Sequence, residues 1–238
     1  MVAVLLLHGG SAEPRARLTI YTEVDPPYNY VDSAGRPEGI FVDLVREIQR
    51  RCGNEAAIQV VPWSRGYRAV QEETNVILFS MARTPEREHL VHWIGPVLEN
   101  RWILFARSDS PLAIRNLDDA RRLPAIGSVR DFAWDQYLEG LGFTNLERVS
   151  ENSLNLHKVA NGRIPAFVGA DLTLPSVAVR CGYRPSNFKP VLVFRAIPLY
   201  IALSGKSRPE LAEAWNRHLA AIKGEGLLER ILARHAGD

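Results

Sequence analysis

The sequence SMARTPERE at residues 80–88 follows the apolar run VILF at 76–79 and precedes VHWIGP at 91–96. The apolar run predicts a buried strand, and Thr84-Pro85 is typical of a helix N-cap followed by proline at the first helical position. This order places Ser80 and Ala82 at the carboxyl end of a strand and Arg87 in the first helical turn. There, a guanidinium and free backbone N–H groups can converge on a carboxylate. The stretch therefore predicts a site for a small anion.

Strand and helix patterns alternate on both sides of this stretch, which predicts an α/β fold with ligands at the carboxyl ends of parallel strands. Two longer β-type segments interrupt the alternation, at 101–107 and 196–203. They bracket a second α/β unit, so the chain should cross twice between two lobes around a hinge. The other expected strands are 18–22, 57–61, 124–126 and 164–169, and the expected helices begin near residues 41, 62, 117, 131, 153, 172, 209 and 226.

Composition excludes some classes of protein. The chain has 238 residues, 46% of them hydrophobic and 24% charged, with a formal net charge of +2. No block of basic residues indicates a nucleic-acid surface. We expect a monomeric, soluble mature protein.

The first 17 residues differ from the rest. A short apolar run at 2–7 is followed by small residues at Gly10 and Ala12. This pattern resembles the end of a secretory signal with cleavage after Ala12. We interpret residues 1–17 as a signal-peptide remnant and leader.

The two cysteines, Cys52 and Cys181, fall in different predicted lobes. Because a bridge between them would lock the hinge, we expect two unpaired thiols. No Cys/His cluster predicts a metal site, and no motif predicts a cofactor.

The opening motif carries a family resemblance. A strand running into Ser-x-x-x-Thr-x-x-Arg, then an apolar-aromatic segment and Gly-Pro, resembles the first-lobe ligand motif of extracellular solute-binding proteins of the polar amino-acid type. YTEVDPPYNY at 21–30 and GIFVDL at 39–44 resemble the opening strand, loop and first helix of the same family. The resemblance extends from about residue 18 to the C-terminus. It implies a periplasmic-binding fold, with lobe 1 formed by 18–103 and 200–238 and lobe 2 by 104–199.

The resemblance also implies site residues in lobe 1. Arg87 would grip the ligand's carboxylate together with backbone groups near Ser80 and Ala82, whereas an ordinary surface arginine would pair with a neighbouring glutamate. Trp63 falls where the family places a wall for the ligand side chain, and Tyr28 in the loop that supplies another. Large aromatic residues are more often part of a core, but both follow strand ends in proline-containing loops, which favours the site.

In lobe 2, the sequence GSVR at 127–130 resembles the family's Gly-Ser/Thr-x turn at a helix start. Ser128, Val129 and Arg130 would then face Arg87 across the cleft. Asp171, or Ala170 if the alignment shifts by one residue, would hold the ligand's amino group. The other acid placed in the cleft is Asp25.

Four arginines, namely Arg65, Arg83, Arg87 and Arg130, are plausible neighbours of this cleft. Arg83 either adds charge to the cleft or points to solvent. Because only two acids are expected there, the arginines outnumber them. The ligand could therefore be either an amino acid or a molecule that carries only negative charge.

The function implied by the resemblance is that of a periplasmic solute-binding protein. It would close around a polar amino acid or related small carboxylate and deliver it to the permease of an ABC transporter. One alternative is an enzyme on the same fold, similar to a cyclohexadienyl dehydratase, which would need a proton-transferring acid. Another is a detached sensor domain.

Overall fold

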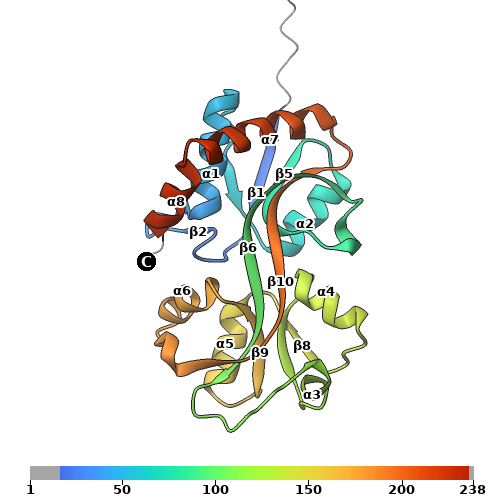
Figure 1. The fold of residues 1–238 in the computed structure, drawn as a ribbon, viewed down its shortest axis with the longest axis vertical. Helices are drawn as coiled ribbons and strands as arrows, with labels where there is room; N and C mark the ends of the chain where they lie inside the picture. The colour runs from blue at the N-terminus through green and yellow to red at the C-terminus, as the bar shows by residue number, and fades with distance from the viewer. Residues whose placement is uncertain (1–16, 236–238) are drawn as a thin grey trace, which may run out of the picture.

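The computed structural model describes residues 17–235, so the leader predicted at 1–17 lies almost entirely outside the described residues. Figure 1 shows two α/β halves, one above the other, connected by two long strands. These are β6 (Val91–Arg107) and β10 (Phe188–Ser204). No described helix is long and apolar enough to cross a membrane.

The upper half, lobe 1, is built on three parallel strands in the order β4-β1-β5. Strand β5 has seven buried residues, VILFSMA. Helix α1 turns Phe41, Leu44, Val45 and Ile48 toward the core, and Gly53 ends it in a left-handed conformation, as the sequence predicts. The elements of lobe 1 are β1 (Thr19–Thr22), β4 (Ile58–Val60), β5 (Val76–Ala82), α1 (Ile40–Cys52), α2 (Trp63–Glu72), α7 (Pro209–Gly224), α8 (Leu227–His235) and the short strands β2 (Tyr30–Val31) and β3 (Pro37–Glu38).

The lower half, lobe 2, is built on three parallel strands in the order β9-β7-β8. The helices of this lobe lie around them (Figure 1). The elements of lobe 2 are β7 (Ile126–Val129), β8 (Leu146–Val149), β9 (Ala166–Ala170), α3 (Leu117–Arg121), α4 (Ala133–Gly140), α5 (Asn152–Ala160), α6 (Thr173–Arg180) and the 3-10 helix η2 (Pro185–Asn187).

The pairing of β6 and β10 locates the connection between the lobes. The two strands pair with each other over most of their length. Within lobe 1, β10 pairs with β5 from Leu199 to Leu203. Within lobe 2, β6 pairs with β9 from Trp102 to Ala106. Because each strand changes lobe near these points, we propose the boundaries predicted from the sequence, 18–103 with 200–238 and 104–199.

Two local predictions need correction, and one strand is missing from the expected elements. The helix expected after Thr84-Pro85 is one 3-10 turn, η1 (Pro85–Arg87), because the chain enters β6 at Val91. Gly127, Ser128 and Val129 do not form a turn but belong to β7, where Ser128 pairs with Arg148 of β8. Strand β8 itself was not predicted, since LERV lacks a continuous apolar run.

Candidate functional site

Two adjoining cavities lie between the lobes. The outer one has a volume of about 500 Å³, a size typical of small-molecule sites, and the inner chamber has about 30 Å³. Glu23, Asp25, Trp63 and Phe132 line both. Lobe 1 thus supplies an acidic and an aromatic edge, and lobe 2 supplies the opposite wall.

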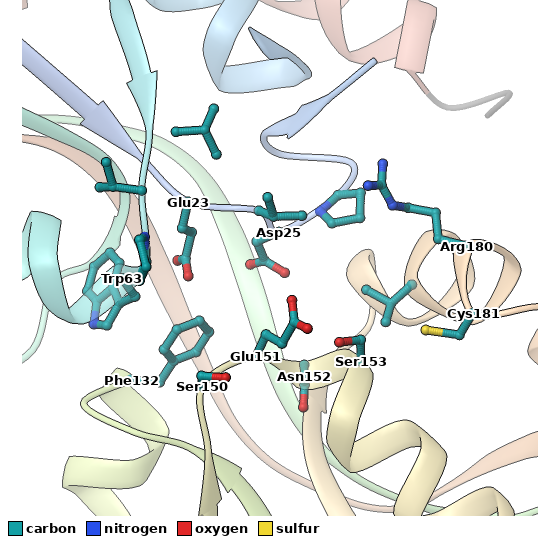
Figure 2. Close-up of a pocket in the computed structure, with 16 residues that line it drawn as sticks. Glu23, Asp25, Trp63, Phe132, Ser150, Glu151, Asn152, Ser153, Arg180 and Cys181 are labelled. Carbon is teal, nitrogen blue, oxygen red and sulfur yellow. The ribbon is translucent and has the colours of Figure 1, made fainter. Parts of the chain in front are cut away.

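The acidic edge follows directly from the end of β1. Glu23 and Asp25 leave the strand at its carboxyl end, and a tight loop fixes their backbone. The Asp25 N–H donates to Asn29 O at 2.7 Å, and Asn29 Nδ2 donates to Glu23 O at 2.8 Å. Figure 2 shows both carboxyl groups pointing from lobe 1 into the cavity, and Glu151 of lobe 2 pointing toward Asp25 from the opposite side. Three acidic side chains therefore share one cavity.

Burial makes two of these acids weak. Desolvation raises the pKa of Asp25 to about 7. It also raises the pKa of Glu23 well above the usual range; the charge of Asp25 adds to this shift, and Arg87 opposes it. Near neutral pH Asp25 is therefore poised between its protonated and ionised forms, and burial favours the protonated form of Glu23.

The aromatic edge joins the lobes. Trp63 is 4% exposed and packs edge-on against Phe132, with ring centroids 5.6 Å apart. Its Nε1 donates across the cleft to Asp131 O at 2.9 Å. Phe132 in turn contacts Trp134 at a centroid distance of 4.7 Å. Trp63 is thus both a wall of the cleft and a contact between lobes.

Arg87 is buried at 1% exposure and also reaches lobe 2. Its Nη2 donates to Asp131 O at 2.8 Å, and its Nε donates to Gln136 Oε1 at 3.1 Å. The guanidinium lies over the ring of Tyr67, 4.7 Å from the centroid. Burial lowers its pKa, an effect that Tyr67 and Glu23 oppose. The predicted carboxylate-binding arginine is therefore in the cleft, with its donors directed at the other lobe.

Ser80 and Ala82 line the inner chamber with Arg87, as the opening motif predicts. Ser80 Oγ donates to Phe79 O at 2.6 Å, and the residue has a positive φ of 58°. Two further buried atoms of the lining residues, Asn100 Oδ1 and Trp134 Nε1, have no hydrogen-bond partner in the described part of the chain. The inner chamber therefore holds polar groups that a bound solute or water would satisfy.

Several predicted residues lie elsewhere. Tyr28 is fully buried in the lobe 1 core, edge-on to Phe41, and lines neither cavity. The expectation that its loop would keep it out of the core is wrong, because the loop packs beneath α1: the Phe41 N–H donates to Tyr28 O at 2.9 Å. Ser128 and Val129 are buried in β7, and neither they nor the exposed Arg130 line these cavities.

Asp171 lies at the end of β9 but is already paired. Its Oδ2 accepts from Arg101 Nε at 2.7 Å, and its Oδ1 accepts from the N–H of Leu172, the residue before α6, at 3.0 Å. Ala170 is fully buried. Neither residue lines the two cavities, so the structure does not present the expected partner for a ligand ammonium there.

The expected surplus of arginines in the cleft is also absent from these cavities. Arg83 pairs with Glu88 at 2.8 Å and lies over Trp93 and Tyr200, away from the cleft. Arg65 is exposed on α2. Of the four predicted arginines, Arg87 alone lines either cavity.

The sequence reasoning missed Glu23 and the lobe 2 loop at 150–153. Glu23 could have been found, since it follows the last residue of a parallel strand, where ligands collect. The loop follows the unpredicted β8 and opens α5, and it contributes Ser150, Glu151, Asn152 and Ser153 to the outer cavity. Arg180 and Cys181, at the end of α6, complete that rim.

Among the described residues no group of three or more His, Cys, Asp or Glu side chains could hold a metal ion. Cys52 and Cys181 are both free, which confirms the predicted unpaired thiols.

Two α/β lobes joined by two long strands, with a cavity between them that both lobes line, define a two-lobed binding protein of the periplasmic-binding fold. The chain belongs to the bacterial extracellular solute-binding proteins, family 3, which match residues 18–238. A comparison with curated proteins found no match.

Solved structures show the same fold. A histidine kinase sensor domain with similarity to periplasmic binding proteins superposes with a TM-score of 0.84 at 24% identity, covering 93% of this chain and 96% of the other. The P235GK mutant of ArgBP from T. maritima gives 0.81 at 20% identity, covering 93% and 95%. AncCDT-1, an ancestral amino acid-binding protein and precursor of cyclohexadienyl dehydratase, gives 0.77 at 22%, covering 92% and 94%. At these identities the likeness is one of fold.

Proposed function

We propose that this protein is a periplasmic solute-binding protein that closes its two lobes around a small polar solute of the amino-acid class and delivers it to an ABC transporter permease. The observation that carries this proposal is the cavity of about 500 Å³ lined from both lobes, which are joined through β6 and β10. A solute that contacts both walls binds the closed form better than the open form and shifts the hinge equilibrium toward closure. Export agrees with the family's description as extracellular.

The lining of the cavity favours a solute with a positive charge. Glu23, Asp25 and Glu151 line it, together with the aromatic rings of Trp63 and Phe132. Such rings attract cations as well as apolar groups. Among polar amino acids, those with a cationic side chain therefore fit this cleft best, and we narrow the expected carboxylate-bearing ligand to that group.

A thermal-shift screen tests the proposal. The panel holds the common amino acids, simple organic acids and cyclohexadienyl acids. A solute at about 100 times its Kd stabilises the folded state by about 2.7 kcal/mol, which raises the melting temperature measurably. We expect arginine or lysine to give the largest shift. If no compound in the panel shifts the melting temperature, the solute-binding assignment for this class is wrong.

Delivery to a transporter needs its own test. In the source bacterium, deletion of the gene should abolish uptake of the radiolabelled solute that the screen identifies. A sensor domain on this fold would instead leave uptake intact and alter gene expression in response to the same solute.

One observation favours an enzyme as a second candidate. The buried pair Glu23 and Asp25 has the raised pKa values that general-acid catalysis near neutral pH requires. A dehydratase acting on cyclohexadienyl acids would convert such a substrate to an aromatic product with a new ultraviolet absorbance. We expect no increase in that absorbance; an increase that Glu23→Gln abolishes would replace the binding-protein assignment.

A further inference from the structure

The groups that would hold the α-carboxylate and α-ammonium of an amino acid are occupied within the protein. Arg87 donates from Nη2 to Asp131 O and from Nε to Gln136 Oε1. These bonds use two of the five guanidinium N–H groups, and of the two cavities Arg87 lines only the inner chamber of about 30 Å³, a volume close to that of one water molecule. A ligand carboxylate could therefore reach the remaining N–H groups only by enlarging that chamber or by displacing the lobe 2 acceptors.

Asp171 is occupied in the same way. Its side chain accepts from Arg101 Nε at 2.7 Å, with side-chain exposures of 22% and 56% for Asp171 and Arg101. Separating this pair to capture an ammonium would leave Arg101 without its acidic partner. The pair thus holds Asp171 beside Arg101 of β6, and Asp171 lines neither cavity.

Apart from Trp134 Nε1, an unpartnered buried donor of the inner chamber, the groups described here are hydrogen-bond acceptors when the acids are ionised. Glu23 and Asp25 line both cavities, and Ser80 Oγ, which donates its hydrogen to Phe79 O, can only accept from a ligand. Asn100 Oδ1 is buried beside them with no partner among residues 17–235. Ammonium and guanidinium groups are donors without acceptor capacity, which makes them the natural complement to such a surface.

The charged side chains of the outer cavity also favour a cationic ligand. The outer cavity is lined by three acids against one cation, Arg180. That arginine is exposed at the rim and lies over the ring of Tyr30, 5.7 Å from the centroid, so it also bridges the lobes. A buried anionic surface is stabilised by a bound cation far more than by a bound anion.

We propose that this cleft recognises its solute through a positively charged amine or guanidine and requires no α-carboxylate, so that carboxylate-free organic cations are ligands. This inference rests on the proposed capture of a small solute between the lobes. It deepens that function by naming the chemical group that is recognised.

Matched pairs of compounds test the inference. L-arginine and agmatine differ only by the α-carboxylate, as do L-lysine and 1,5-diaminopentane. Isothermal titration calorimetry should give a Kd for each carboxylate-free compound within about tenfold of its amino acid, a difference of no more than about 1.4 kcal/mol. The reverse result, tight binding of the amino acid and a loss of more than about tenfold without the carboxylate, overturns the inference while leaving solute binding intact.

Variants assign the binding to the acidic edge. Glu23→Gln and Asp25→Asn should each weaken agmatine at least about tenfold. Glu213→Gln, at an exposed position on α7, is the matched control and should have no effect. Circular dichroism checks that each variant is folded. Unchanged agmatine affinity in both folded acidic-edge variants, or no binding of either cation by the wild type, contradicts the inference. In the latter case, binding of an anion such as L-glutamate would still support solute capture.

Discussion

Arg87 of lobe 1 donates a hydrogen bond of 2.8 Å to the backbone carbonyl of Asp131 in lobe 2. The same carbonyl accepts from Trp63 Nε1 at 2.9 Å, so one oxygen of lobe 2 anchors two side chains of lobe 1. Asp131 presents it from a left-handed conformation, with φ of 62°, at the turn between β7 and α4. The lobes therefore touch through protein groups, in addition to any contact that a solute makes.

This link predicts that Arg87 controls closure before any solute arrives. Arg87→Ala removes both hydrogen bonds to lobe 2 and Arg87→Lys removes the forked geometry, so both should shift the ligand-free protein toward an open form. Small-angle X-ray scattering should show a larger radius of gyration for both variants. Arg65→Ala, at an exposed arginine of α2, should match the wild type. An unchanged radius in Arg87→Ala would mean that Arg87 does not hold the lobes together.

Asp25 predicts an unusual dependence of stability on pH. Folding raises its pKa from 3.8 to about 7, so the folded state holds a proton that the unfolded chain releases. Its favourable contribution is complete below the unfolded pKa and is lost as the pH rises through about 7. The ligand-free protein should therefore lose melting temperature between about pH 4 and pH 7.

Asp25→Asn should flatten that dependence and raise the melting temperature at the alkaline end, because the buried amide carries no charge. Differential scanning fluorimetry of wild type and variant in the same buffers isolates this group from the histidines. Parallel curves for the two proteins would show that Asp25 does not titrate in this range. Glu23 lies beside it and contributes in the same direction, since its pKa is also raised.

Solute affinity should change with pH in the opposite sense. A cation binds the ionised carboxylates, so binding must displace a proton from Asp25 wherever the site is protonated. The affinity for L-arginine should rise from about pH 6 to pH 8, by at most about tenfold per unit for each proton released. Calorimetry in buffers of different ionisation enthalpy measures the proton release directly. Identical affinity at both ends of the range would indicate that the acids do not contact the solute.

Asp171 should have little influence on binding. Since Arg101 already occupies its carboxylate, Asp171→Asn removes a partly exposed ion pair, a class of interaction worth about 0–1 kcal/mol. We expect Asp171→Asn to change the solute affinity less than about threefold, whereas Asp25→Asn should lower it strongly. A tenfold loss in Asp171→Asn would restore the role that the family resemblance implies for this residue.

The sequence predicts the fold well because its signals are local. The apolar run of β5, the helical spacing in α1 and its glycine cap each depend on neighbouring residues alone. Their alternation specifies the parallel strands of each lobe. The full length of β6 and β10 was underestimated, since much of each strand crosses between lobes and alternates in burial without a continuous apolar run.

The site was harder to predict because it depends on contacts between distant residues. The motif correctly brings Ser80, Ala82 and Arg87 to one chamber, yet nothing local shows that Gln136, 49 positions away, accepts from Arg87. Likewise, Asp171 can be placed at a strand end from sequence, but its pairing with Arg101 follows from the register of β6 against β9. These pairings between distant residues decide which charged side chains can still bind a solute.

A crystal structure of the protein with its tightest-binding cation tests the central claim most directly. The account predicts that the solute lies between the lobes, with its amine or guanidine within hydrogen-bonding distance of Glu23 or Asp25, while Arg87 keeps its bonds to Asp131 and Gln136. A solute held by its carboxylate on Arg87, with its cationic group away from both acids, would contradict it.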